Sequence, residues 1–286
     1  MRRAPEGKGM YIWQLGECCG GDHMELAVRA VEAGLSWVAL KIQERDSVYT
    51  PNLKYLDAAI AGLRAVGVEV WGWGYIYPKS RLGRVIVRDE AEDTIRLVRG
   101  YDVAGFIVNA EIEWQAGDTL AKRAAWADEY MDVTRAGLPD TPIGFSSFKY
   151  PTLHPLPWGA FLEEADFYQE QVYWEQAHNP ASQLERSLRE WRAYGDKPSV
   201  PAGSAYGVGA WRATVGDVDM FNRAVVAAGC PAIMWWDWQN ADGTALWEAI
   251  KAHRWGGAPA PAPTPVTPSD ALPRLWAEAL RQGWTP

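Results

Sequence analysis

The chain has 286 residues, of which 48% are hydrophobic and 22% charged, so it can bury a large core and is not an intrinsically disordered protein. A formal net charge of −8 argues against a nucleic-acid partner, because proteins that bind phosphates cluster lysine and arginine. No apolar run reaches the roughly 20 residues that a membrane span needs, and MRRAPEGKGM lacks the apolar part of a signal peptide. We therefore expect a protein made in the cytoplasm, without a standard signal peptide and without a membrane span.

Apolar segments of strand length alternate with helical segments along most of the chain, which is the pattern of parallel βαβ units. Eight segments are predicted as strands: 9–15, 35–43, 67–76, 102–112, 141–148, 165–173, 198–204 and 231–238. Eight units predict an α/β fold of the (β/α)8 barrel type. An open, doubly wound sheet is the alternative, but no G-x-G-x-x-G follows the first strand, where a dinucleotide-binding fold would have one.

Apolar residues recur at helical spacing between the first three predicted strands. The first helix is predicted from Leu26, Val28, Ala30 and Val31, before Gly34, and the second from Leu53, Leu56, Ile60 and Leu63, before Gly67. Glycine is favoured just after a helix ends, because it adopts the left-handed conformation without strain. Both helices fit the outer ring of a barrel.

The composition changes after the predicted barrel, which we assign to residues 1–256. Residues 257–270 are rich in proline and alanine and predict a semi-rigid linker. Residues 271–286 predict a short amphipathic helix, whose apolar residues are Leu272, Leu275, Trp276 and Leu280. This helix either packs on the barrel or docks a further module through the linker.

The three cysteines, Cys18, Cys19 and Cys230, cannot all pair within one chain, and adjacent cysteines rarely form a disulfide because the geometry is strained. Paired cysteines in zinc sites are usually separated by two to four residues. We therefore predict no metal and no cofactor.

Polar residues at the carboxyl end of the fourth predicted strand are the first candidates for chemistry, because barrels place their active sites at that end. In GFIVNAEIEW, one face carries Phe106, Val108, Ala110 and Ile112 and should pack under helices. The other face carries Asn109, Glu111 and Glu113 and should point into the barrel mouth. The glutamates either form a structural ion pair with Lys41 or include a general acid whose pKa is raised by its neighbour and by apolar walls.

The other predicted strand ends contribute rings, amides and hydroxyls. Seventeen tryptophans are more than a core of this size usually needs, since each buried ring must place its N–H group. Aromatic rings beside amides and carboxylates suit a sugar, which stacks its C–H faces and hydrogen-bonds through its hydroxyls. The candidate substrate-binding residues are Trp13, Lys41, Trp73, Tyr75, Ser146, Gln169, Gln171, Tyr173 and Trp235, with Asp237 as a further candidate catalytic carboxylate.

Signatures of other hydrolases are missing from the sequence. It has no G-x-S-x-G, no H-E-x-x-H and no phosphate-binding P-loop, and only four histidines. Among mechanisms of hydrolysis, this leaves catalysis by the carboxyl groups of aspartate and glutamate.

Several segments resemble known glycoside hydrolases. IVNAEIEW resembles the Asp-x-Glu of family 25 lysozymes and, more loosely, the Asp-x-Asp-x-Glu of family 18 chitinases. AIMWWDWQN is similar to the tryptophan-bearing last strand of both families. SSFKYPTLHPLPW, QVYWEQAHNPASQLERS and PAGSAYGVGAW resemble glycoside-hydrolase-like barrels from phage and bacterial sequences. Asn109 departs from family 25, which has aspartate there, and the first strand in YIWQLGE offers no aspartate.

The resemblance implies a lysozyme-like enzyme, such as a phage endolysin, that hydrolyses peptidoglycan or a related N-acetylated polysaccharide and acts on the cell wall after release. Glu111 would protonate the glycosidic oxygen, and Asn109 and Glu113 would orient it or stabilise the developing oxocarbenium ion. The second carboxylate would be Glu113 or Asp237, or the acetamido group of the substrate would attack instead, held by Gln171, Tyr173 or Asp237. The alternative is a non-catalytic carbohydrate-binding barrel, for example a phage structural or wall-anchoring part, in which Asn109 marks lost catalysis.

Overall fold

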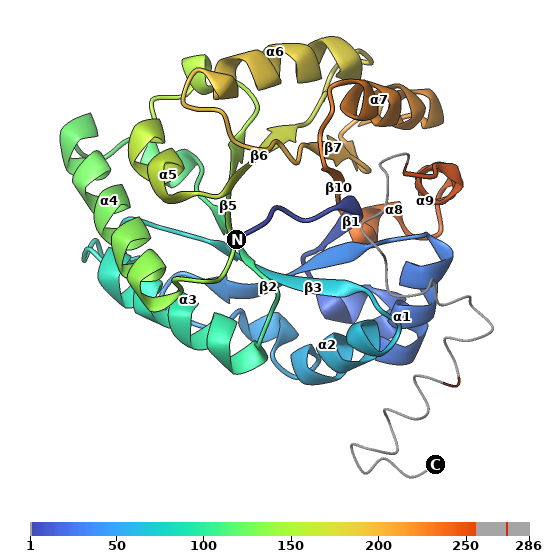
Figure 1. Cartoon of the computed structure of the whole chain (residues 1–286), viewed down its shortest axis with the longest axis horizontal. Helices are drawn as coiled ribbons and strands as arrows, with labels where there is room; N and C mark the ends of the chain where they lie inside the picture. Colours follow the sequence, from blue (N-terminus) through green and yellow to red (C-terminus); the bar gives the residue numbers. More distant parts are fainter. Residues whose placement is uncertain (1, 256–272, 274–286) are drawn as a thin grey trace.

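The structure, a computed structural model, describes residues 2–255 and residue 273. Eight parallel strands close into a barrel in the order β1-β10-β7-β6-β5-β4-β3-β2, and helices surround it (Figure 1). The predicted (β/α)8 fold is confirmed. The predicted linker (257–270) and terminal helix (271–286) lie, apart from residue 273, outside the described residues.

Each of the eight barrel strands overlaps its predicted segment. The strands are β1 (Gly7–Ile12), β2 (Trp37–Glu44), β3 (Glu69–Tyr75), β4 (Phe106–Asn109), β5 (Ile143–Phe148), β6 (Phe167–Val172), β7 (Ala202–Ser204) and β10 (Ala232–Trp236). A separate antiparallel pair, β8 (Gly207–Val208) and β9 (Trp211–Arg212), forms a hairpin after β7.

Helices connect the strands on the outside of the barrel. They are α1 (His23–Glu32), α2 (Leu56–Ala65), α3 (Val87–Tyr101), α4 (Leu120–Gly137), α5 (Trp158–Glu164), α6 (Pro180–Arg192), α7 (Val215–Ala227), α8 (Trp238–Ala241) and α9 (Ala245–Ala252). Short 3-10 helices are η1 (Leu15–Glu17), η2 (Cys19–Gly21), η3 (Thr50–Asn52), η4 (Ile112–Trp114) and η5 (Pro151–Leu153). No helix in residues 2–255 is long and apolar enough to cross a membrane.

The ends of the first two helices follow local sequence signals. Asp22 caps α1 by accepting hydrogen bonds from the backbone N–H groups of the first turn. Gly34 and Gly67, just beyond α1 and α2, adopt positive φ values of 64° and 82°, as expected for glycines that end helices. Leu53, expected within the second helix, lies before it and is 50% exposed.

Large rings fill the barrel interior because glycines on neighbouring strands leave room for them. A Cβ atom on Gly9 would lie 2.2 Å from the Trp37 ring, and one on Gly144 would lie 2.2 Å from the Phe167 ring. Gly105 makes the same allowance for Trp71. The part of the barrel around these glycines is therefore a packed core that leaves no open channel.

The fourth strand is shorter than predicted. It ends at Asn109, and Glu111, with φ −133° and ψ −133°, leads directly into η4. Trp114 anchors this turn by donating from its indole N–H to the carbonyl of Ile76 at 3.0 Å. As a result, Ile112 does not pack under the helices as expected and is 60% exposed.

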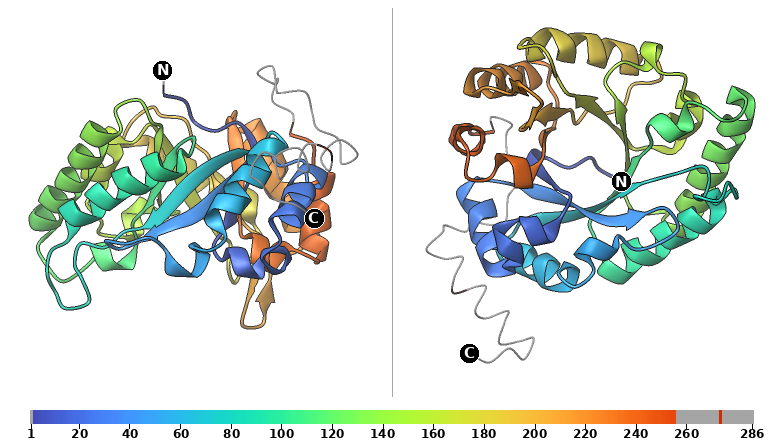
Figure 2. Two further views of the ribbon diagram at one scale, coloured as in Figure 1. Left: turned by 90° about the horizontal axis from the view of Figure 1, so that it is seen from below. Right: turned by 180° about the vertical axis from the view of Figure 1, so that it is seen from behind.

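The two longest projections of the barrel lie at one end. In the left view of Figure 2, the hairpin β8–β9 and the loop between β3 and α3 project on the side opposite to the N-terminus. The loop is tied back on itself by a bridge between Lys79 and Val85. Because all barrel strands are parallel, their carboxyl ends meet at this end, and the candidate residues gather there.

Candidate active site

Glu111 lies in the barrel mouth, and two amides hold its carboxylate. Its Oε1 accepts hydrogen bonds of 2.9 Å from Asn109 Nδ2 and of 2.9 Å from Gln171 Nε2. Gln171 Nε2 also donates to Asn109 Oδ1 at 3.0 Å, so β4 and β6 position the carboxylate together.

The environment of Glu111 changes its acidity. Burial raises the pKa of its carboxyl above the ordinary value, the bonds from Gln171 and Asn109 act in the opposite direction, and the charge of Glu113 adds to the rise. A carboxyl group with a raised pKa keeps its proton to a higher pH than an exposed one does. That is the property a general acid needs.

Ser146 and Gln169 lie below Glu111 and have no exposed surface. Tyr11 donates from its hydroxyl to Gln169 Oε1 at 2.6 Å, and Gln171 Nε2 donates to Ser146 Oγ at 3.4 Å. In this structure, Ser146 and Gln169 therefore support the mouth from inside the barrel.

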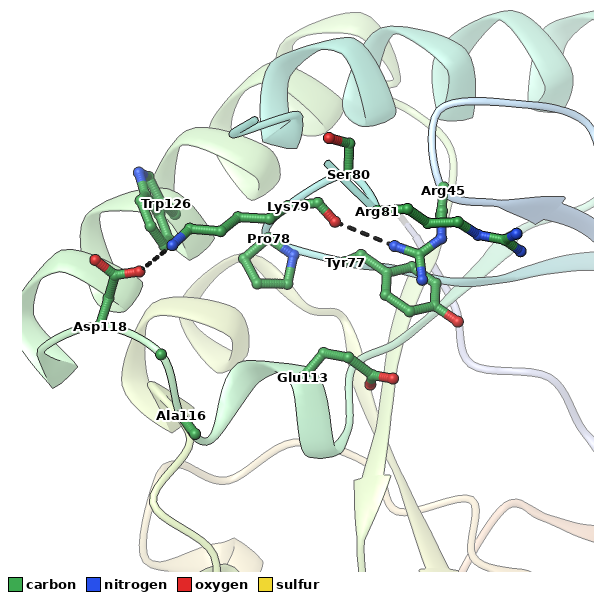
Figure 3. A pocket seen from close by; sticks show the side chains of 11 residues that line it. Arg45, Tyr77, Pro78, Lys79, Ser80, Arg81, Glu113, Ala116, Asp118 and Trp126 are labelled. Carbon is green, nitrogen blue, oxygen red and sulfur yellow. Dashed lines mark hydrogen bonds and ion pairs between the residues drawn. The ribbon is translucent and has the colours of Figure 1, made fainter. Parts of the chain in front are cut away.

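Glu113 lies apart from this amide pair. It belongs to η4, and its Oε2 accepts a 2.6 Å hydrogen bond from the hydroxyl of Tyr75 on β3. It therefore lies toward the loop that follows β3, where Figure 3 shows it below Tyr77 and Pro78.

Lys41 does not form the structural ion pair considered for the glutamates. Its ammonium donates to Glu44 Oε2 at 2.8 Å and lies 4.3 Å from the ring centre of Tyr49 and 5.0 Å from that of Trp73. Burial lowers the pKa of Lys41, and the bond to Glu44 opposes this effect. No salt bridge joins Lys41 to Glu111 or Glu113 in the described residues, although the charge of Lys41 lowers the pKa of the Glu111 carboxyl.

An aromatic cluster lines the mouth around Trp236. The ring of Trp236 lies 5.2 Å from Tyr11, 5.6 Å from Trp73 and 6.4 Å from both Trp13 and Tyr173, measured between centroids. Trp13 stands at the rim, where 37% of its surface is exposed. Tyr11 and Trp73 are buried beneath, so the partly exposed rings of Trp13, Tyr173 and Trp236 are the ones that a ligand in the mouth can contact.

Trp235 lies on the other side of the wall, so its expected place in the mouth is corrected. It is fully buried outside the barrel, 5.5 Å from the ring of Phe221 on α7 and 6.5 Å from that of Trp174. Successive side chains of a strand point to opposite faces, so only one of the two neighbouring tryptophans can face inward. That residue is Trp236.

Asp237, the other candidate carboxylate, caps α8. Its Oδ1 accepts from Asn240 Nδ2 at 2.6 Å, while its buried Oδ2 has no partner among the described residues. Burial raises the pKa of Asp237 to about 6. Burial also raises the pKa of Tyr173, and the charges of Glu111 and Asp237 add to that rise, so its hydroxyl lies within electrostatic reach of both carboxylates.

The sequence did not single out Tyr11 or Arg45. Tyr11 shares the inward face of the first strand with Trp13, so the alternation of that strand could have identified it. Arg45 lies just beyond β2 and depends on loop conformation, which no local pattern indicates. Within residues 2–255, no group of three or more histidine, cysteine, aspartate or glutamate side chains could hold a metal ion.

No protein-family model matches the sequence, and no curated protein matches it significantly. Solved structures do match. A chitinase from Bacteroides thetaiotaomicron is 10% identical, with a TM-score of 0.66 over 87% of this chain and 96% of that one. A class V chitinase mutant from Cycas revoluta in complex with (GlcNAc)3 is 10% identical, with a TM-score of 0.61 over 85% and 98%. The chitinase-like agglutinin from Robinia pseudoacacia is 11% identical, with a TM-score of 0.59 over 85% and 98%.

These similarities span nearly the whole of each neighbour, and their low identity makes them a statement about fold. The barrel of this chain has the fold of chitinases and of a chitinase-like agglutinin.

Proposed function

We propose that the protein is a glycosidase that hydrolyses a polysaccharide of N-acetylated sugars, with Glu111 as the general acid. The observation that carries this proposal is the half-buried Glu111 in the mouth, whose carboxyl has a raised pKa, is fixed by two amides and acts electrostatically on Tyr11 and Tyr173 of the aromatic cluster. The fold shared with chitinases supports the same class of reaction.

In the proposed first step, Glu111 gives its proton to the glycosidic oxygen, and the bond from that oxygen to the anomeric carbon breaks. Asn109, bonded to the Glu111 carboxylate, keeps it oriented. Within residues 2–255, no second carboxylate is bonded to Glu111, whereas the charge of Glu111 acts on the Tyr173 hydroxyl and raises its pKa. We therefore favour attack on the anomeric carbon by the acetamido oxygen of the substrate, held by Tyr173 and Gln171, over attack by Glu113 or Asp237.

In the second step, water attacks the anomeric carbon of the cyclic intermediate and gives its proton to Glu111. The acetamido group and the general acid are then restored. Glu111 thus acts as an acid in one step and as a base in the next.

Within this substrate class, we favour peptidoglycan of the bacterial cell wall, which the protein would reach after release, as an endolysin does. The support is the resemblance of IVNAEIEW to lysozyme sequences. Chitin, which carries no charge, is the alternative substrate. The structural neighbour in complex with (GlcNAc)3 supports N-acetylglucosamine, a sugar that peptidoglycan and chitin share.

A non-catalytic carbohydrate-binding barrel is the second candidate. Asn109 stands where lysozymes and chitinases of the resembling families carry aspartate, and an agglutinin shares the fold. Such a barrel would use the ring faces around Trp236 without cleaving the glycan.

One experiment on the purified protein distinguishes the glycosidase from the binding barrel. Reducing-sugar release and loss of turbidity are measured on peptidoglycan and on colloidal chitin, with pull-down on the same materials. Release of reducing ends supports the glycosidase and identifies its substrate, whereas retention without release supports the binding barrel. Neither release nor retention on any N-acetylated glycan would refute both.

A further inference from the structure

A cavity of about 260 Å³ lies beside Glu113 (Figure 3). Its walls come from the segment after β2, the loop after β3 and the segment between η4 and α4. The side chains that decide its chemistry are Arg45, Tyr77, Lys79, Arg81, Glu113 and Trp126.

The two ends of the cavity differ in how their cations are paired. At one end, Lys79 is paired with Asp118 at 2.5 Å (Figure 3). Asp118 also accepts from Lys122 at 2.8 Å, so each ammonium group there has a carboxylate partner. At the other end are Arg45 and Arg81, neither of which forms an ion pair with any residue in 2–255. Both residues line the cavity, in a chain whose net charge is −8.

Arg45 is held in place before any ligand binds. The Arg45 guanidinium stacks on Tyr77, 3.3 Å from the ring centre, and donates to the carbonyl of Lys79 at 3.1 Å. The backbone N–H of Tyr77 donates to both carboxylate oxygens of Glu90, at 3.1 and 2.9 Å, which fixes the loop. A site ordered before binding loses less entropy when its ligand arrives.

Glu113 connects this cavity to the candidate active site. Its side chain lines the cavity, it is two residues from Glu111, and its charge contributes to the raised pKa of the Glu111 carboxyl. Glu113 brings one negative charge to the cavity wall, where its Oε2 accepts from Tyr75. Arg45 and Arg81 bring two positive charges to the same cavity.

We propose that this cavity binds a carboxylate substituent of the glycan, on a sugar next to the one whose bond is cleaved. The inference rests on the proposed function and narrows its substrate class to acidic glycans. The planar guanidinium group matches a carboxylate with two parallel hydrogen bonds, and the Tyr77 ring holds the Arg45 guanidinium in place. The lactyl ether of N-acetylmuramic acid and the carboxylate of a uronic acid both provide this chemistry, whereas a chitin oligosaccharide has no group for the arginines.

The test is calorimetric binding to the full chain carrying Glu111→Gln, so that no probe is cleaved. The probes are triacetylchitotriose, an oligosaccharide of N-acetylglucosamine and N-acetylmuramic acid, and one of N-acetylglucosamine and glucuronic acid. At low salt, we expect at least one acidic probe to bind about tenfold more tightly than triacetylchitotriose. The acidic probe that shows this preference identifies the source of the carboxylate.

Arg81→Gln should remove most of the preference without harming the fold, because Arg81 is exposed. Arg45→Lys should retain part of the preference and Arg45→Gln should lose it. Arg189→Gln, the same charge change at an exposed position on α6, should leave the preference unchanged. The preference should also shrink as salt is added, because exposed charges are screened.

Equal affinity for all three probes would overturn this inference but not the proposed function. A preference for the acidic probe that survives both Arg81→Gln and Arg45→Gln would do the same. If no probe binds and the wild type cleaves none of them, the proposed function fails as well.

Discussion

Replacing Glu111 by glutamine should abolish hydrolysis and leave glycan binding nearly unchanged. Glutamine keeps an oxygen where Glu111 Oε1 accepts from Asn109 Nδ2 and Gln171 Nε2, so both 2.9 Å bonds can persist. What it lacks is a transferable proton. General acid catalysis is worth about 10²- to 10⁴-fold, or about 3 to 5 kcal/mol of transition-state stabilisation.

We expect the rate of reducing-sugar release to fall by at least about 10²-fold. The partners of Glu111 are amides, so none of them can take over as the proton donor. The melting temperature should not fall, since burying an amide costs less than burying a carboxylate. Pull-down on peptidoglycan and chitin serves as the binding control. If the variant hydrolyses glycan at the wild-type rate, the acid lies elsewhere, and Asp237, with its pKa of about 6, is the next candidate.

Three further changes test the surroundings of the site and the core. Glu113→Gln removes a charge that raises the pKa of Glu111, so the alkaline limb of the pH–rate profile should move to lower pH; an unmoved limb would contradict this coupling. Trp236→Ala should weaken glycan binding by about 1 kcal/mol, or about fivefold, in calorimetry, and unchanged affinity would exclude the aromatic cluster as a binding surface. Burial raises the pKa of Glu170 on β6 from 4.5 to about 7, so the folded state binds its proton more tightly and wild-type stability should fall as pH rises from about 4.5 to 7. The loss of stability amounts to at most about 3 kcal/mol, and Glu170→Gln should remove it. Stability is measured by denaturant unfolding at pH 5 and pH 8. If the variant still loses stability between these pH values, Glu170 is not the group responsible.

The barrel could be predicted from the sequence because its signal is repeated. Apolar segments of strand length alternate with helical segments, and glycines such as Gly34 and Gly67 follow helices, so an error at one strand end does not change the fold. Strand ends were less accurate: β4 stops at Asn109 because Trp114 draws the following turn toward Ile76.

The site was predictable only in part. Alternation along the fourth strand correctly placed Asn109 and Glu111 on the same face. The prediction that Trp235 lies in the mouth was wrong, because its neighbour Trp236 faces inward. Both residues are tryptophan, so composition could not decide which one faces the mouth. The pairing of Arg45 with the loop after β3 joins residues more than 30 positions apart, and only the folded chain shows it.

The division between strand-held and loop-held residues bears on how such an enzyme can diversify. Glu111 is fixed by amides on two wall strands, whereas the cavity beside Glu113 is built largely from residues 77–81 and 116–118, which belong to no barrel strand. Insertions and exchanges in connecting segments are tolerated far better than changes to a closed sheet. Exchanging only these two segments with those of a related barrel should therefore change which glycan is preferred and leave the Glu111 proton donor unchanged.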